Sequence, residues 1–172
     1  KGQRHRRQVA ITFDDGPSPF TLEILDLLDK YDAKASFFCI GSQVLRYPEI
    51  AKKIVEKGHV IANHSMSHPN EMGFLSSGKV RIEIEAANRT IETATGKRAL
   101  LYRPPFGVSN PHIAKALQDC NLTSIGWNIR SLDTLNLGEH QIFARIKKRL
   151  SPGSIILLHD TSEKTIRVVK SL

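Results

Sequence analysis

The sequence has few of the features that mark membrane, disulfide-rich or nucleotide-binding proteins. Its apolar runs are short, such as residues 155–158, and none approaches the roughly 20 residues that cross a bilayer. Only two cysteines occur, and we expect both Cys39, in a strand, and Cys120, on the apolar side of a helix, to be buried thiols. Neither a Gly-x-Gly-x-x-Gly motif nor a P-loop motif is present, so nothing supports a nucleotide site.

Acidic residues are scarce relative to basic ones. The chain holds 25 Lys and Arg against 17 Asp and Glu, a formal net charge of +8. Such a surface favours polyanions, whether nucleic acid, anionic lipid or an acidic cell-wall polymer. Nucleic acid is the weakest of these partners, because no aromatic residues alternate with the charges as single-strand binding requires. Part of the excess lies in residues 1–7, which we predict to be a basic N-terminal tail.

Apolar runs alternate with segments of helical periodicity along the whole chain of 172 residues. Repeated β-α units imply a parallel sheet, and the chain is shorter than the roughly 250 residues of an eight-fold barrel. The sequence therefore predicts one α/β domain over residues 8–172, a distorted, incomplete (β/α) barrel with parallel strands, and leaves open a further strand beyond Leu172. The predicted strands are residues 8–13, 34–40, 59–62, 99–102, 122–127 and 154–158.

The segment VAITFDDGPSPF, residues 9–20, ends an apolar strand in two adjacent carboxylates, Asp14 and Asp15. A solvated turn is the simpler explanation of a single Asp-Asp-Gly sequence. Polar side chains follow most of the other predicted strands as well, however, and the carboxyl ends of parallel strands meet at one face, where the active sites of α/β folds lie. We therefore expect one site that also includes His64, His68, Arg103, Asp133, His159 and Asp160.

His64 and His68 are four residues apart, a spacing that on a helical turn places both on one side. Two histidines and a carboxylate form a three-ligand set with open positions, as in catalytic zinc sites and in non-haem iron oxygenases. A further carboxylate, an arginine and a histidine would supply the base, the acid and the tuning groups of metal-assisted hydrolysis. The oxygenase is disfavoured, because its ligand set usually lies on an all-β barrel. Taken singly, Arg103 could form a structural ion pair and Asp160 could cap a helix.

Five short sequences carry a resemblance to a known family. TFDDGPS, HSMSHP, RPPFG, SLD after Trp127, and LLHD resemble, in order and spacing, the motifs of the polysaccharide deacetylases, carbohydrate esterase family 4. The resemblance runs from about Val9 to Asp160. It implies an incomplete (β/α) barrel that hydrolyses N-acetyl groups, or O-acetyl groups in some members, on aminosugar polymers. It also implies a place in the cell envelope or outside the cell, with any signal peptide or membrane tether upstream of Lys1.

The resemblance implies a role for each motif residue. Asp14 corresponds to the general base and Arg103 to the arginine that orients it, while His159 corresponds to the general acid and Asp133 to the carboxylate that tunes it.

The metal ligands and the substrate contacts are implied in the same way. Asp15, His64 and His68 correspond to the ligands of one divalent ion, zinc in the first place, with cobalt or nickel as alternatives. The expected partner is an acetylated polysaccharide; the oligomeric state stays open. Phe106, through its backbone N–H as oxyanion donor, Leu157 and Trp127 correspond to the residues around the acetyl group.

The fourth motif departs from the family pattern, which has an aspartate three places before Asp133 and a tryptophan directly after it. Here these places hold Arg130 and Thr134. We expect a wider and more positive cleft, and a preference for substrates that carry carboxylates over neutral chitin oligomers. The alternative is a non-catalytic carbohydrate- or polyanion-binding domain on a degenerate deacetylase scaffold. The intact acid, base and metal set favours the enzyme, because binding alone needs none of them.

Overall fold

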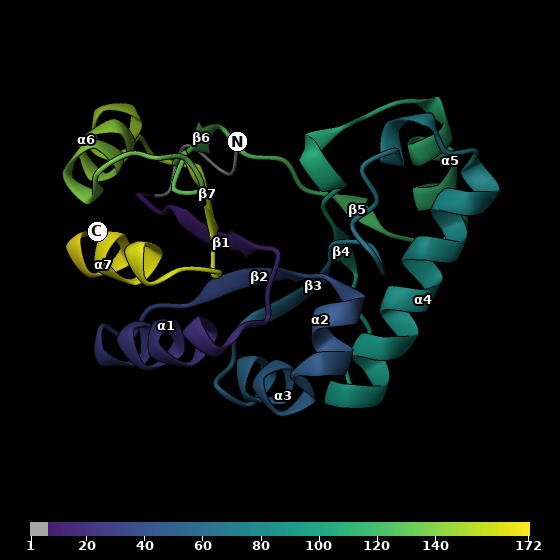
Figure 1. Ribbon diagram of the computed structural model, residues 1–172, viewed down its shortest axis with the longest axis horizontal. Coiled ribbons are helices and arrows are strands. Elements are labelled where there is room, and N and C mark those ends of the chain that lie inside the picture. Colours follow the sequence, from purple (N-terminus) through teal and green to yellow (C-terminus); the bar gives the residue numbers. More distant parts are fainter. Residues whose placement is uncertain (1–6) are drawn as a thin grey trace.

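The computed structural model describes residues 7–172, so that most of the predicted basic tail lies outside the described residues. Its centre is one seven-stranded sheet in the order β5-β4-β3-β2-β1-β7-β6, in which all neighbours are parallel. The sheet curls, with helices around its outer side, and within the described chain its edge strands β5 and β6 do not pair with each other (Figure 1). This is the predicted incomplete (β/α) barrel.

The elements alternate along the chain as predicted. The strands are β1 Ala10–Asp14, β2 Ala35–Cys39, β3 Val60–Asn63, β4 Leu101–Tyr102, β5 Thr123–Ser124, β6 Ile129–Arg130 and β7 Ile155–His159. The helices are α1 Pro19–Lys30, α2 Gly41–Arg46, α3 Pro48–Glu56, α4 Ser77–Thr95, α5 Pro111–Asp119, α6 Glu139–Arg149 and α7 Glu163–Ser171, with short 3₁₀ turns η1 Met72–Phe74 and η2 Pro105–Gly107.

The predicted strand over residues 122–127 is wrong in its extent. Only the two residues of β5 pair with β4, and a separate strand, β6, pairs with β7 at the opposite edge of the sheet. The chain between them therefore crosses the open side of the barrel. The carbonyls of Ile125 and Gly126 accept hydrogen bonds from the Arg103 side chain instead of from a neighbouring strand, which is why the apolar run does not continue as a strand.

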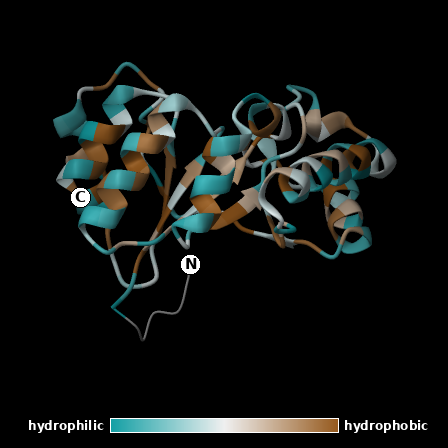
Figure 2. Cartoon of the chain, turned by 90° about the horizontal axis from the view of Figure 1, so that it is seen from below, coloured by the Kyte–Doolittle hydropathy of each residue, from teal (hydrophilic) through white to brown (hydrophobic). Residues whose placement is uncertain are grey.

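The alternation of side chains along each strand separates the residues that form the core from those that face the site. Phe13, Phe37 and Ile156 point outward and form the main core with buried residues of α1, α3, α6 and α7. Figure 2 shows the matching hydrophobic stripes on the helices. Successive side chains of a strand point to opposite faces, so Asp14 and its register partner His159 project to the concave side. The alternation of the first strand thus places its last carboxylate inside the barrel.

A second apolar cluster lies between α4, α5 and η1, and includes Tyr102 and Cys120. Both cysteines are buried and free, as predicted. The helix-end signals are confirmed: Ser18 caps α1 with Pro19 as its first residue, and Gly96 ends α4 in the left-handed conformation at φ 68°. Across residues 7–172 no helix is both long enough and apolar enough to span a membrane.

His59, directly before β3, is a buried histidine outside the site. Its Nδ1 accepts a hydrogen bond from the Ala35 N–H at 3.3 Å, and its Nε2 has no partner among the described residues. Protonation of Nδ1 would break the bond from Ala35. Burial is the main cause that lowers the pKa of His59 below its ordinary 6.5, with Lys34 and Lys57 lowering it further and Asp29 opposing them.

We predict that His59 makes the fold less stable in acid. The pKa of His59 is lower in the folded than in the unfolded chain. The stability that neutral His59 contributes is therefore fully present above about pH 6.5 and is lost as the pH falls through the folded pKa. The slope is at most about 1.4 kcal/mol per pH unit. His59→Asn keeps an acceptor for Ala35 but does not titrate. Its free energy of unfolding, measured with urea at acidic and at neutral pH, should therefore lack this part of the pH dependence.

His112→Asn, which removes an exposed histidine of α5, is the control and should follow the wild type. Parallel loss of stability in His59→Asn and the wild type on acidification would contradict the prediction.

Candidate metal centre and active-site cleft

The second of the two adjacent aspartates of the first motif has a left-handed backbone conformation. Asp14 is the last residue of β1 and is 3% exposed. Asp15 has a φ of 73°, a conformation that Asp tolerates better than most residues, and it redirects its own side chain away from that of Asp14. The Asp14 carboxylate meets Arg103, while that of Asp15 meets two histidines.

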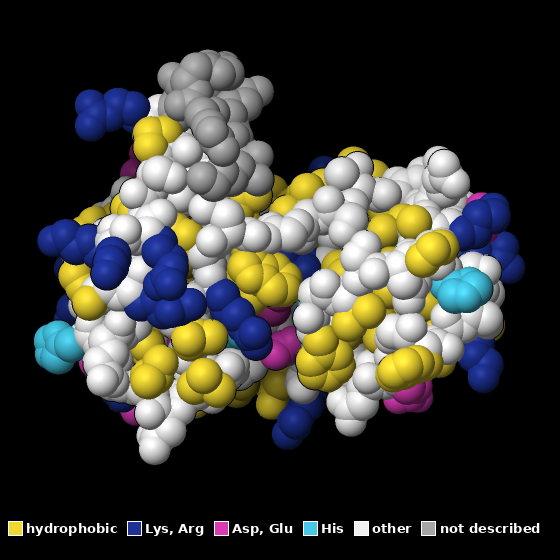
Figure 3. All heavy atoms as spheres, turned by 90° about the horizontal axis from the view of Figure 1, so that it is seen from above, with side chains coloured by type: hydrophobic (Ala, Val, Ile, Leu, Met, Phe, Trp, Pro, Cys, Tyr) yellow, Lys and Arg dark blue, Asp and Glu magenta, His cyan; other side chains and the backbone are white. Residues whose placement is uncertain are grey.

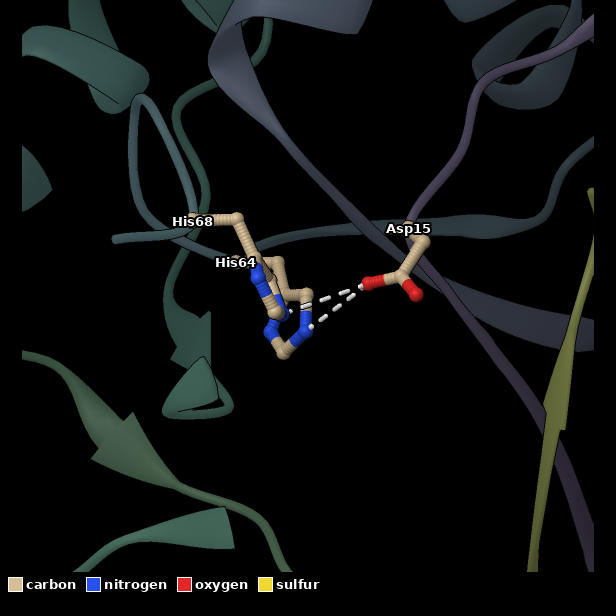
Figure 4. A group of neighbouring side chains, drawn as sticks. All are labelled: Asp15, His64 and His68. Atoms are coloured by element: carbon tan, nitrogen blue, oxygen red, sulfur yellow. Dashed lines mark ion pairs between the residues drawn. The ribbon is translucent and has the colours of Figure 1, made fainter. Parts of the chain in front are cut away.

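Asp15, His64 and His68 form a compact donor set. The Asp15 Oδ1 atom lies 3.3 Å from His64 Nε2 and 3.5 Å from His68 Nε2, and the candidate ligand atoms all lie within 4.8 Å of one another (Figure 4). Bonds of about 2.0–2.2 Å in a tetrahedral site separate ligand atoms by roughly 3.3–3.5 Å. The three side chains therefore fit one divalent ion of the zinc type.

The expected helical turn between the two histidines is absent, and that prediction is wrong. His64 and His68 lie in a loop after β3, in which Ser65 and His68 both have positive φ, 66° and 52°. The Ser65 hydroxyl accepts a hydrogen bond from the His68 N–H, and Glu83 of α4 accepts from Met66 and Ser67. This loop, held from both sides, brings the two imidazole centroids to 5.0 Å.

His64 is oriented by a second partner. Its Nδ1 lies 2.6 Å from the backbone carbonyl of Arg103, so that Nδ1–H donates and the Nε2 lone pair faces Asp15. Burial and the neighbouring His64 lower the pKa of His68, which favours the neutral imidazole that binds metals. For Asp15, burial opposes ionisation, but the interactions with His64, His159 and His68 outweigh it and lower the pKa of Asp15.

Behind Asp14 lies a buried arginine. The Arg103 Nη1 atom donates to Asp14 Oδ1 at 2.6 Å and to the Thr12 hydroxyl at 2.9 Å. The guanidinium is fully buried and lies 4.0 Å from the Phe38 ring centroid. Burial raises the pKa of Asp14 above its ordinary value, while the charges of His64, Arg103 and His159 act in the opposite direction. A carboxylate with a raised pKa is better matched to accepting a proton near neutrality.

Behind His159 lies a buried aspartate. Asp133 Oδ1 is 2.8 Å from His159 Nδ1, and its Oδ2 accepts from the His159 backbone N–H at 2.8 Å. The hydroxyls of Ser131 and Thr165 donate to the same carboxylate. Burial lowers the pKa of His159, but the hydrogen bond and charge of Asp133 prevail and raise it. His159 thus turns Nε2 toward the donor set, 3.9 Å from Asp15 Oδ2.

One cavity joins these groups. The Phe106 side chain is 60% exposed, and its ring meets that of His68 edge-on at 4.7 Å. Trp127 packs against Gly107, where φ is 70° and a Cβ would lie 2.4 Å from the indole. Arg103 and Asp133 do not line this cavity but lie behind the residues that do. The cavity is lined by Asp14, Asp15, His64, His68, Phe106, Gly107, Trp127, Arg130, Thr134, Leu157 and His159.

Asp160 is neither in the cavity wall nor a helix cap, since Ser162 caps α7. Its carboxylate is buried and accepts from the Thr21 hydroxyl, and a Cβ on Gly16 would lie 2.2 Å from its Oδ2. Burial raises its pKa to about 7. Asp160 therefore packs under the turn that carries Asp14 and Asp15, and this contact explains why residue 16 is glycine.

Sequence reasoning missed the hydroxyl groups that support the site. Thr12, Thr165 and Ser131 donate to or accept from the buried charged pairs, and Asn63 accepts from the Ser65 N–H in the histidine loop. Ser131 lies within the SLD motif and Thr12 within TFDDGPS, so their positions were visible although their roles were not. Thr165 lies beyond the last motif and carries no sequence signal.

An open (β/α) barrel with an Asp-His-His donor set at the carboxyl ends of its strands defines the class of the protein, and comparison with known proteins identifies the family. The family model "Polysaccharide deacetylase" matches residues 1–125. A chitooligosaccharide deacetylase of Bradyrhizobium sp. is 33% identical over 90% of this chain and 71% of its own length. A peptidoglycan-N-acetylglucosamine deacetylase of Bacillus cereus is 35% identical over 95% of the chain and 78% of its own. The chain therefore belongs to the polysaccharide deacetylase family.

Solved structures agree with the fold and add a caution about activity. The peptidoglycan deacetylase PdaC of Bacillus subtilis has a TM-score of 0.90 at 31% identity, over 98% of this chain and 82% of its own. A pseudoenzyme of carbohydrate esterase family 4 from Bacillus anthracis has a TM-score of 0.92 at 29% identity, over 99% of this chain and 60% of its own. Both active and inactive proteins thus share this architecture.

We predict that the purified protein binds one equivalent of divalent ion, with zinc bound best, through Asp15, His64 and His68. Removing one neutral ligand of three, in His64→Ala, should lower the affinity by two orders of magnitude or more, because the open site offers no replacement. Elemental analysis and competition with a zinc chelator measure both quantities. His112→Ala is the control; stoichiometric metal that persists in His64→Ala would refute the ligand set.

Proposed function

We propose that the chain is a metal-dependent hydrolase that removes N-acetyl groups, or O-acetyl groups, from an aminosugar polymer such as peptidoglycan or chitin oligosaccharide. One observation carries the proposal. Two differently supported titratable groups adjoin the donor set, Asp14 at 3.8 Å from His64 and His159 at 3.9 Å from Asp15. A carboxylate paired with a buried arginine can serve as a base, and an imidazole paired with a buried aspartate can serve as an acid. The two are placed for one hydrolytic step.

Asp14 acts as the general base in this mechanism. A divalent ion, when bound, supplies a Lewis acid for the acetyl carbonyl and makes water more acidic. Asp14 takes the proton of the water that attacks the carbonyl carbon. Arg103 holds the carboxylate in place through the 2.6 Å bond, so that the other oxygen, Oδ2, faces the donor set.

His159 acts as the general acid. The backbone N–H of Phe106 donates to the oxygen that becomes negative as water adds. The C–N bond then breaks, and the amine leaves with the proton of His159 Nε2. Asp133 fixes the ring through Nδ1 and favours its protonated form. Leu157 and Trp127 enclose the acetyl methyl group, and acetate is the second product.

The partner of this activity is an acetylated polysaccharide, with residues 8–172 as the catalytic domain and the cell envelope or the exterior as its place of action. The names of the relatives, chitooligosaccharide and peptidoglycan deacetylases, support this. The second candidate, a binding domain without catalysis, is favoured by the similarity to a pseudoenzyme. Retention of every acid, base and ligand residue in one cavity supports the enzyme.

We predict metal-dependent acetate release from acetylated chitin or peptidoglycan fragments. A chelator should abolish it, and added zinc should restore it. Asp14→Asn should lower kcat by about two to four orders of magnitude, the usual contribution of a positioned base, yet retain stoichiometric metal. Asp15→Asn should lose activity together with the metal, and excess metal should restore part of it.

The asparagine at position 14 keeps an oxygen that accepts from Arg103, so thermal unfolding serves as the control for folding. An Asp14→Asn protein that keeps most of its activity, or that loses its metal, would show that the roles are divided differently. Folded, metal-loaded wild type that releases no acetate from any acetylated glycan would favour the binding domain.

We predict that Asp133→Asn narrows the pH range of activity from the alkaline side. Asp133 raises the pKa of His159, and the acid must be protonated, so weakening this interaction moves the alkaline limb of kcat/KM to lower pH. We expect kcat to fall by about 10²-fold at its optimum as well. Ser131→Ala removes one hydroxyl from the same carboxylate and is the matched control. An alkaline limb that stays at its wild-type position in Asp133→Asn would argue against His159 as the acid.

A further inference from the structure

Arg130 is a cation in the wall of the cleft without an acidic partner among residues 7–172. It pairs in register with Leu157 of β7, and register partners project from the same face of a sheet. Its neighbour Ile129 points outward into the core, so Arg130 projects to the concave side with Leu157. Its side chain is exposed and lines the same cavity as Asp15 and His159.

The carboxylates in that cavity are already used. Asp14 is bonded to Arg103, and Asp15 faces the two histidines. No ion pair of the described chain includes Arg130. A cation held at a site that is to bind a divalent ion is repelled by that ion, and an anionic group on the substrate would offset the repulsion.

The positive charge continues from Arg130 onto α6. The Arg145 Nε donates to the Arg130 backbone carbonyl at 2.9 Å, which joins the helix to the cleft wall. Lys148 and Arg149 follow Arg145 by three and four residues, so that the three share one side of the helix, and both are exposed. We call Arg130, Arg145, Lys148 and Arg149 the cationic wall. None of its four members has an ion pair with any described residue.

Uncharged aromatic residues line the same cleft as Arg130. These are Phe106 and Trp127. Figure 3 shows acidic side chains at the bottom of a hollow, hydrophobic side chains along its rim, and Lys and Arg side chains gathered on the half of the face that holds α6. A glycan strand in this cleft would have sugar rings against the aromatic residues and its ionised substituents against the cationic wall.

We propose that the cationic wall selects aminosugar polymers that carry carboxylates, with Arg130 as the residue that discriminates them at the catalytic cavity. The proposal rests on the deacetylase function and specifies its substrate class. Arg130 is a specificity residue, because it contacts a substituent and not the reacting bond. Exposed ion pairs contribute up to about 1 kcal/mol each, about five-fold in affinity, so two pairs give a preference of up to about 25-fold.

The test uses one oligosaccharide in two forms. N-acetylglucosamine–N-acetylmuramic acid oligosaccharides carry lactyl carboxylates, and amidation of these gives a neutral form of the same length. For each form, kcat/KM is measured with the wild type, Arg130→Gln, the triple variant R145Q/K148Q/R149Q, and Lys147→Gln. Lys147 lies on the same helix but turned away from the cationic wall, over the Phe143 ring, and is therefore the matched control.

We expect the wild type to prefer the acidic form about ten-fold at low salt and to lose the preference at high salt, because exposed charges are screened. Arg130→Gln should reduce the ratio of acidic to amidated kcat/KM about five-fold, chiefly through KM, and the triple variant should reduce it similarly. Lys147→Gln should keep the wild-type ratio. Equal turnover of both forms by the wild type, or an equal loss on both forms in Arg130→Gln, would overturn the proposal.

A binding measurement separates this proposal from the deacetylase function. The metal-loaded wild type is titrated with fluorescently labelled oligosaccharide of each form, whether or not it releases acetate. Tighter binding of the acidic form that Arg130→Gln weakens supports the cationic wall even if no acetate is released, and the proposed function then fails by itself. Acetate release without any preference in binding or turnover leaves the function standing and overturns the cationic wall.

Discussion

The buried ion pair between Arg103 and Asp14 is the interaction on which the site depends. Arg103 follows β4 and Asp14 ends β1, so the pair joins segments far apart in the sequence across the interior of an open barrel. Every side-chain nitrogen of Arg103 has an acceptor, and its face covers the Phe38 ring. A buried charge without such partners costs several kcal/mol, so the Arg103 side chain can occupy the barrel interior only when the surrounding acceptors are all in place.

The same residue connects the proposed base to the candidate metal centre. The Arg103 side chain positions Asp14, and its backbone carbonyl orients His64. The geometry of the proposed base and of one proposed ligand is thus fixed by one residue whose position is set by the sheet. Asp133 has the corresponding place behind His159, where it is held by hydroxyl groups from the preceding loop and from α7. Both Asp14 and His159 are therefore held in place by buried partners and face the cleft with their other side.

Similarity to active enzymes and to a pseudoenzyme shows that this fold alone does not fix an activity. The side chains in the cavity decide whether a protein with this fold is active. In this chain the proposed acid, base and metal ligands all line one cavity, and the same cavity combines aromatic residues with the cation Arg130. The proposed catalytic groups are held by buried partners, whereas the side chains of the cationic wall are exposed.

Hydrophobic periodicity determined the β-α alternation and the side of each strand that faces the core, because these follow from local patterns of burial, and the chain length indicated that the barrel is incomplete. The sequence motifs contained most of the residues that line the cavity. The tertiary structure decided what depends on long-range contact. The edge strand β6 exists only because β7 lies beside it, and the histidine pair meets through a loop with positive φ instead of a helical turn. Likewise, the roles of Thr12 and Thr165 could not be predicted from the sequence, since a hydroxyl becomes part of a site only when the folded chain places a buried charge within hydrogen-bonding distance.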